Sequence, residues 1–154
     1  MKQQRTESWR GTVNPSWRIA IVHSSYYKKE MAQLQESARK GLLEAGILSK
    51  NIIEREAAGS FEIPLIGDAL ASEKKVDALI GLGIIVEGET HHAELLAQQA
   101  ARGMMDVQLR YQIPFAFEVL YVNDLQSARA RLHRGTEAAR AVLHSLAQLK
   151  SLRS

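Results

Sequence analysis

The stretch ALIGLGIIVEGETHH, residues 78–92, joins a continuous apolar run to a glycine turn and two adjacent histidines. The run at 78–86 is rich in Ile and Leu, which is typical of a strand buried on both faces of a parallel sheet. Apolar residues then follow a helical spacing to about Arg110. Backbone N–H groups at a glycine turn that opens a helix favour an anion such as phosphate. We therefore expect an anion site here, with Thr90 able to cap the helix and His92 in its first turn.

The composition is that of an ordinary globular chain of one domain. The 154 residues include 45% apolar and 24% charged residues, a balance that supports a real core. The net charge is only +3 and the basic residues are scattered, which argues against a dedicated nucleic-acid binder. The absence of cysteine excludes disulfides, thiolate metal sites and cysteine nucleophiles. The first residues lack the apolar region of a signal peptide and no run is long enough to span a bilayer, so we expect a cytoplasmic protein.

Strand and helix patterns alternate along the chain. The sequence predicts strands at 18–23, 52–57, 78–86 and 115–120, and helices at 28–45, 63–73, 91–110 and from about 125 to the end, broken near 135. Such alternation predicts βαβ units and a parallel sheet with helices on both faces, a three-layer α/β/α sandwich. The polar residues 1–17 are interpreted as an N-terminal arm and residues 18–154 as a single domain.

Ligands of such sheets bind beyond the carboxyl ends of the strands, so the loops there are the candidates for a site. Tyr26 follows the first strand, and Phe61 and Glu62 follow the second. Taken singly, the two aromatic residues are typical of packing at a sheet edge, and Glu62 of a solvated or capping residue. His92 alone is typical of a surface or capping histidine. A zinc site is disfavoured, because His91 and His92 point about 100° apart on a helix and no cysteine is present.

The motifs taken together resemble the lumazine synthase family over about residues 19–149. The resemblance is carried by GSFEIP at 59–64, GETxH at 88–92, IPFAF at 113–117 and Arg131. Glu87 and the short link from Arg131 to Gly135 are closer to the short-loop archaeal type than to the common bacterial one. The resemblance implies a flavodoxin-like four-stranded parallel sheet of order 2-1-3-4. It also implies that a strand of the N-terminal arm is exchanged to a neighbouring subunit.

The family condenses 5-amino-6-ribitylaminouracil with 3,4-dihydroxy-2-butanone 4-phosphate to give 6,7-dimethyl-8-ribityllumazine, phosphate and water. By resemblance, Tyr26 stacks on the pyrimidine and Glu62 binds the ribityl hydroxyls. The polar edge of the pyrimidine is read by backbone around four residues, which are Ser60, Phe61, Ile85 and Val86. Phe117 is expected to come from the neighbouring subunit.

The phosphate end of the implied pocket is the turn at residues 88–90. Its backbone amides at Gly88, Glu89 and Thr90 would bind the phosphate together with Arg131. His92 would be the catalytic residue that moves protons during imine formation and elimination. The resemblance implies no metal, nucleotide or flavin cofactor.

The expected partners are the two small substrates and further copies of the chain. The family assembles as pentamers, and some members close twelve pentamers into a 60-subunit icosahedral shell. Neither nucleic acid nor a membrane is expected as a partner. The sequence does not decide between the pentamer and the shell.

Three departures from the family pattern lie near the expected pocket. Glu118 stands where glycine is usual, and Tyr27 where a small polar residue is common. The segment 132–136 is shorter than the lysine-bearing loop of many members, and whether Arg134 replaces that lysine is open. These departures keep two alternatives open. One is a catalytically weak or inactive cage-forming or flavin-binding scaffold, natural or engineered, and the less favoured one is an archaeal-type riboflavin synthase.

Overall fold

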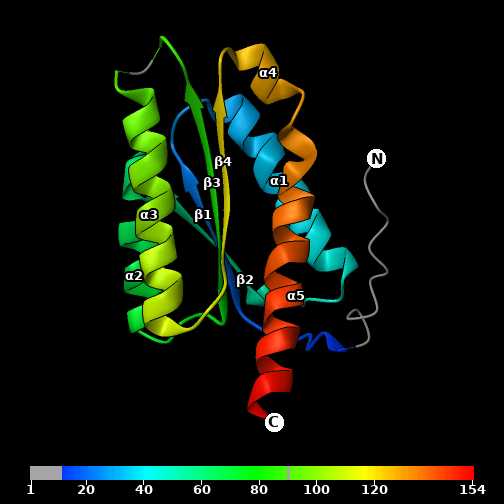
Figure 1. Cartoon of the computed structure of the whole chain (residues 1–154). Coiled ribbons are helices and arrows are strands. Elements are labelled where there is room, and N and C mark those ends of the chain that lie inside the picture. Colours follow the sequence, from blue (N-terminus) through cyan, green and yellow to red (C-terminus); the bar gives the residue numbers. More distant parts are fainter. Residues whose placement is uncertain (1–11, 90) are drawn as a thin grey trace.

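The computed structural model describes residues 12–89 and 91–154, which form one sheet covered by helices on both faces (Figure 1). The strands are parallel and run in the order β2-β1-β3-β4. This is the predicted flavodoxin-like order. The strands are β1 (Ile19–Ser24), β2 (Ile52–Ala57), β3 (Ala78–Val86) and β4 (Phe115–Val122). The α-helices are α1 (Lys28–Glu44), α2 (Ile63–Ser72), α3 (Ala93–Tyr111), α4 (Leu125–Arg129) and α5 (Gly135–Arg153). Short 3-10 turns are η2 (Ser49–Asn51), η3 (Ser60–Glu62) and η4 (Leu132–Arg134).

Helices α2 and α3 cover one face of the sheet, while α1, α4 and α5 cover the other (Figure 1). The predicted three-layer sandwich is therefore confirmed. All nine residues of β3 are buried, as expected for a central strand between two helix layers. Alternate residues of β3 enter opposite cores: Ile80 and Leu82 pack towards α1 and α5, whereas Leu79 and Ile85 pack towards α2 and α3.

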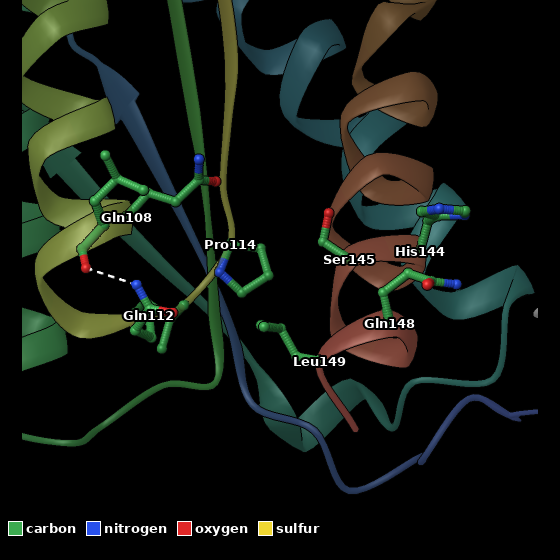
Figure 2. A pocket seen from close by; sticks show the side chains of 9 residues that line it. Gln108, Gln112, Pro114, His144, Ser145, Gln148 and Leu149 are labelled. Atoms are coloured by element: carbon green, nitrogen blue, oxygen red, sulfur yellow. Dashed lines mark hydrogen bonds between the residues drawn. The ribbon is translucent and has the colours of Figure 1, made fainter. Parts of the chain in front are cut away.

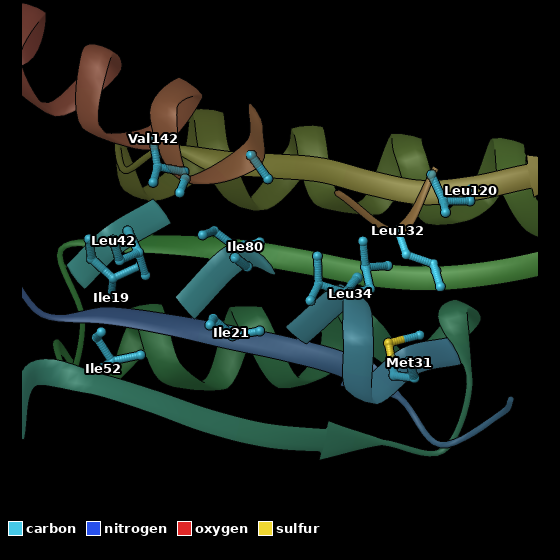
Figure 3. Packing of buried hydrophobic residues seen from close by; sticks show 14 of the residues in the cluster. Ile19, Ile21, Met31, Leu34, Leu42, Ile52, Ile80, Leu120, Leu132 and Val142 are labelled. Atoms are coloured by element: carbon cyan, nitrogen blue, oxygen red, sulfur yellow. The ribbon is translucent and has the colours of Figure 1, made fainter. Parts of the chain in front are cut away.

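The core on the α1 and α5 side is built mainly from branched aliphatic side chains (Figure 3). Ile19 and Ile21 of β1 lie beside Leu34 and Leu42 of α1, and all four are fully buried. Burial of each such side chain contributes about 1.5–3 kcal/mol to folding. This packing fixes the helices against the sheet and so fixes where the loops at the strand ends begin.

The helix ends follow local rules in part. Helix α1 ends before Gly46, whose φ of 107° and N–H bond to the Leu43 carbonyl form a left-handed C-terminal stop. Pro64 lies in the first turn of α2, where its missing N–H is harmless. Both placements agree with the helices predicted at 28–45 and 63–73.

Two predicted boundaries near the site are wrong. Helix α3 starts at Ala93 rather than His91, because His92 adopts a left-handed conformation that cannot continue a helix. Strand β4 ends at Val122 rather than Leu120, because Tyr121 and Val122 still pair with Ile85 and Val86 of β3. The other strand and helix ends agree with the prediction to within one residue, but the last helical stretch is interrupted at 130–134 and restarts at Gly135, where the break was predicted.

Residues 1–11 of the predicted arm lie outside the described residues. Its last part, residues 12–17, packs against the domain: Val13 and Trp17 contact the core, and the Leu48 N–H donates to the Pro15 carbonyl at 3.1 Å. The separation of an arm at residue 17 stays a prediction, and so does strand exchange with a neighbour. Within the described residues, none of the helices is both long and apolar enough to cross a membrane.

Candidate functional site

The turn after β3 contains a glycine in a left-handed conformation, with residues 89–92 between it and the start of α3 at Ala93. Gly88 has a φ of 84°, a conformation that side chains rarely adopt, and the space beside its Cα is open. The Glu87 N–H donates to the Val122 carbonyl at 2.8 Å, so hydrogen bonding to β4 continues as far as Glu87, the residue before Gly88. Gly88 and Glu89 are exposed, and Thr90 lies outside the described residues.

His92 lies directly before α3, not in its first turn as the sequence predicted. Its φ is 57°, its side chain makes no capping hydrogen bond to the helix, and the ring is exposed. Its carbonyl accepts the Leu96 N–H at 3.0 Å and so begins the helix. The rings of His91 and His92 are 6.2 Å apart. In the described ranges 12–89 and 91–154, no three His, Asp or Glu side chains are grouped to hold a metal ion.

Tyr26 and Glu62 converge on Gly59. A methyl group at position 59 would lie 3.2 Å from the Tyr26 ring and 3.5 Å from Glu62 Oε1, so the glycine lets the two side chains approach each other. Hydrogen bonds tie the loops together, since Ser25 Oγ donates to the Ala58 carbonyl at 2.6 Å. Tyr26 is 63% exposed and thus presents a free aromatic face beside a carboxylate.

Ser60 is buried, and the reason lies in β3. A methyl group at position 83 would collide with Ser60 Oγ, so Gly83 makes room for the hydroxyl against the sheet. Ile85 and Val86 also point their side chains into the two cores. These three residues can therefore offer a ligand only backbone groups, whereas Phe61 is 58% exposed.

Phe117 and Arg131 lie on a different surface, the open edge of β4. They line a cavity of about 430 Å³ together with residues 118–123, Ser127 and Arg134. Arg131 is held in place, because its Nη1 donates to the Ser127 carbonyl at 2.7 Å. None of the predicted residues from the loops after β1, β2 and β3 lines this cavity. The predicted site residues thus do not share one cavity within a single chain, although Tyr121 of the β4 cavity bonds to Glu87 beside the Gly88 turn.

The charges in the β4 cavity are mixed. Burial raises the pKa of Glu118 to about 7, with repulsion from Glu137 acting in the same direction and Arg134 opposing it. The third arginine of this segment, Arg129, lies elsewhere: its Nη2 is 3.2 Å from Oε1 of the buried Glu30. Two arginines and one carboxyl group of shifted pKa therefore line the cavity.

Sequence reasoning missed two contacts beside the anion turn. The Tyr121 hydroxyl donates to a carboxylate oxygen of Glu87, and the Tyr27 hydroxyl donates to Glu89 Oε2 at 3.0 Å. The predicted strand at 115–120 ends one residue before Tyr121, whereas β4 extends to Val122. A signal was nevertheless present, since residues 117, 119 and 121 continue the apolar alternation of a strand.

A second hollow of about 300 Å³ lies near the start of β4, between α3 and α5 (Figure 2). Its lining includes Gln108, Gln112, Pro114 and His144, and it contains no predicted site residue. The Gln112 side chain is bonded within its own helix end, donating to the Leu109 carbonyl at 2.9 Å.

Comparison with known proteins identifies the family of this chain. The 6,7-dimethyl-8-ribityllumazine synthase family matches residues 16–150. The synthase of that name from Paracidovorax citrulli is 36% identical over 135 residues, covering 87% of this chain and 88% of the relative. That from Ruthia magnifica is 33% identical over 139 residues, covering 86% and 83%. That from Neisseria meningitidis is 33% identical over 127 residues, covering 82% and 80%. This chain belongs to the 6,7-dimethyl-8-ribityllumazine synthase family.

Proposed function

We propose that this chain condenses 5-amino-6-ribitylaminouracil with 3,4-dihydroxy-2-butanone 4-phosphate to form 6,7-dimethyl-8-ribityllumazine, a transferase step of riboflavin biosynthesis. The observation that carries the proposal is the shared edge of the sheet. Tyr26 and Glu62 meet over Gly59 at this edge, and the Gly88 turn and His92 follow the adjacent strand β3. A stacking face, a carboxylate, an anion turn and an imidazole are the groups that this pair of substrates requires.

The pyrimidine substrate would bind at the loops after β1 and β2. Its ring stacks on Tyr26, and Glu62 accepts hydrogen bonds from the ribityl hydroxyls. The polar edge of the ring meets backbone groups of Ser60, Phe61, Ile85 and Val86. Burial of three of these side chains supports a backbone role, because a buried side chain cannot face the ligand.

The phosphate of the second substrate would bind the amides of Gly88, Glu89 and Thr90, together with the Arg131 guanidinium. His92 would accept and return protons during imine formation and phosphate elimination. Its exposure and lack of a capping bond support this role, because the ring is free to approach a ligand. Both substrates are reactive, so holding them together supplies much of the rate enhancement.

The complete pocket would form between two copies of the chain, because its parts lie on two surfaces. We propose that the β4 edge of one subunit, with Phe117 and Arg131, covers the strand-end loops of its neighbour. A cyclic arrangement of such contacts gives a closed ring, and a pentamer is the proposed ring. Twelve pentamers forming a shell and a cytoplasmic location remain predictions from the sequence.

The activity test follows product absorbance after purified protein is mixed with both substrates. A rate above the spontaneous reaction is expected, and no excess rate would rule the proposal out. The alternatives of an inactive flavin-binding scaffold or a riboflavin synthase are not favoured by the family match. Riboflavin titration of the same sample tests the scaffold alternative, because tight binding without turnover would support it.

The two-subunit site is tested by mixing two impaired variants and assaying them at a butanone phosphate concentration well below its KM. His92→Ala and Arg131→Ala are unfolded together and refolded so that their subunits assemble at random. If the two residues come from different subunits, some sites in the mixture carry both intact residues and activity returns in part. Activity that stays at the level of the separate variants would show that one subunit supplies both residues.

A further inference from the structure

The turn proposed to bind phosphate carries a carboxylate on each side of its glycine. Glu87 precedes Gly88 and Glu89 follows it, and both are exposed. A carboxylate near a bound phosphate repels it, and it can also accept the N–H groups that the phosphate needs. The two charges therefore have to be kept away from Gly88 if the turn is to bind an anion well.

Glu89 is held from the β1 side of the turn. The Tyr27 hydroxyl donates to Glu89 Oε2 at 3.0 Å, and Tyr27 directly precedes α1 in the loop that follows β1. Tyr27 has a φ of 53°, which is unusual for a bulky residue. Tyr27 thus combines a rare backbone conformation with a side chain that reaches Glu89 in the Gly88 turn.

Glu87 is held from the other side. Tyr121, near the end of β4, donates its hydroxyl hydrogen to a Glu87 carboxylate oxygen. This bond is the main reason that the pKa of Tyr121 rises to about 12. A phenol with such a pKa remains protonated at neutral pH and keeps its ability to donate.

The sheet order determines how the two bonds act together. Strand β3 lies between β1 and β4; one tyrosine comes from the loop that follows β1 and the other from β4 itself. The first carboxylate is drawn towards β4 and the second towards β1. Gly88, with its open surroundings, lies between them.

We propose that Tyr27 and Tyr121 are positioning residues that hold Glu89 and Glu87 apart and so keep the Gly88 turn open to the phosphate of the substrate. The inference rests on the proposed function, because it concerns the same phosphate site. Each tyrosine acts through the carboxylate that it binds.

The test uses Tyr27→Phe and Tyr121→Phe in the full-length assembled protein, with inorganic phosphate as the probe in calorimetric titration. Each variant keeps the ring and loses only the hydroxyl. We expect phosphate binding to weaken about threefold to tenfold, as one freed charge near the anion predicts. The KM of the butanone phosphate should rise by a similar factor, while kcat and the KM of the pyrimidine stay within about twofold.

Rescue separates a released charge from a general structural defect. Adding Glu89→Gln to Tyr27→Phe, or Glu87→Gln to Tyr121→Phe, removes the freed charge and should return phosphate affinity to within about twofold of the unaltered chain. Tyr111→Phe is the matched control, because the Tyr111 hydroxyl also binds a carboxylate, Asp68 Oδ1 at 3.0 Å, but at the far end of α3. It should leave phosphate binding unchanged.

The outcomes are distinguishable from failure of the proposed function. Unchanged phosphate affinity in both Phe variants, or no rescue by the Gln substitutions, overturns the positioning role even if the unaltered protein turns over its substrates. Absence of phosphate binding by the unaltered protein overturns the inference and the phosphate site together. Weakened binding with rescue supports the inference.

Discussion

The two hollows beside β4 differ in size and, more sharply, in chemistry. The one near the carboxyl end measures about 430 Å³ and is lined by Arg131, Arg134 and Glu118. The one near the amino end measures about 300 Å³ and is lined mainly by amide and apolar side chains, with His144 its one ionisable residue. The larger hollow is also the one lined by charged side chains, and these side chains distinguish the candidate site from the hollow at the amino end.

The topology explains this difference. Every strand is parallel, and the helices run back against them, so the amino ends of α3 and α5 lie at the carboxyl edge of the sheet (Figure 1). Helix amino ends favour anions and helix carboxyl ends disfavour them. An anionic substrate is therefore expected at one end of β4 only. Substitutions at the two ends test this comparison directly.

The largest effect is expected for His92→Ala. Loss of the proposed proton-transfer group should lower kcat about 100-fold, since general acid–base catalysis contributes at least that much in most enzymes. Phosphate affinity should remain within about twofold, because the Gly88 amides are unchanged. Steady-state absorbance and phosphate titration measure the two quantities.

His144→Ala is the matched control at the amino-end hollow. It makes the same chemical change and should leave kcat and both KM values unchanged. An equal loss of kcat in both variants would contradict the assignment of the chemistry to the carboxyl edge.

Arg131→Ala should have the next largest effect. A charge-assisted hydrogen bond contributes about 1.5–3 kcal/mol, so the KM of the butanone phosphate should rise about tenfold or more. The KM of the pyrimidine should change little, because Arg131 is assigned to the phosphate. Varying each substrate in turn separates the two constants.

Arg153→Ala provides the comparison at the other end, where Arg153 Nη2 donates to the Gln112 carbonyl at 3.2 Å. Removing this cation should not change either KM. If Arg131→Ala lowers kcat alone and leaves the KM of the phosphate substrate unchanged, a phosphate-binding role for Arg131 is wrong.

Those features of the fold that depend on local sequence could be predicted. The run at 78–86 has no polar residue and no alternation, so its burial on both faces and its ends followed directly. Gly46 directly follows the predicted helix end at 45, and glycine is the residue type that most often adopts the left-handed conformation after a helix. These signals do not require knowledge of what packs beside them.

The features of the site that depend on distant partners were not predictable in the same way. The end of β4 is determined by the pairing of Tyr121 and Val122 with β3, and the partner strand of a residue cannot be identified from the sequence around residue 121 alone. The left-handed conformation of His92 could not be predicted from its residue type, because glycine and asparagine are the residues that usually indicate such a conformation. The Tyr27–Glu89 bond joins residues 62 positions apart, so no spacing rule indicates it.

The smallest effect is expected for Glu118→Gln and concerns stability. The pKa of Glu118 is raised from 4.5 to about 7 in the folded chain, so the folded state retains a proton that the unfolded state releases. The contribution of this proton to the free energy of unfolding is fully present below about pH 4.5 and is lost as the pH rises through about 7. The glutamine variant stays neutral and should avoid the loss. At pH 8 it should be more stable than the unaltered chain by about 1 kcal/mol, a value reduced for solvent screening.

Urea unfolding at pH 5 and pH 8, at one fixed subunit concentration, measures this difference. The two proteins should be closer in stability at pH 5 than at pH 8, because the unaltered chain is largely protonated at position 118 in the acidic sample. The sign of the stability difference at pH 8 is also informative. If the attraction between Glu118 and Arg134 were stronger than the cost of burying the carboxylate, the glutamine variant would be less stable than the unaltered chain at this pH. Such a result would mean that Arg134 is neutralised by Glu118, and it would leave Arg131 as the cation of this cavity that can bind the phosphate.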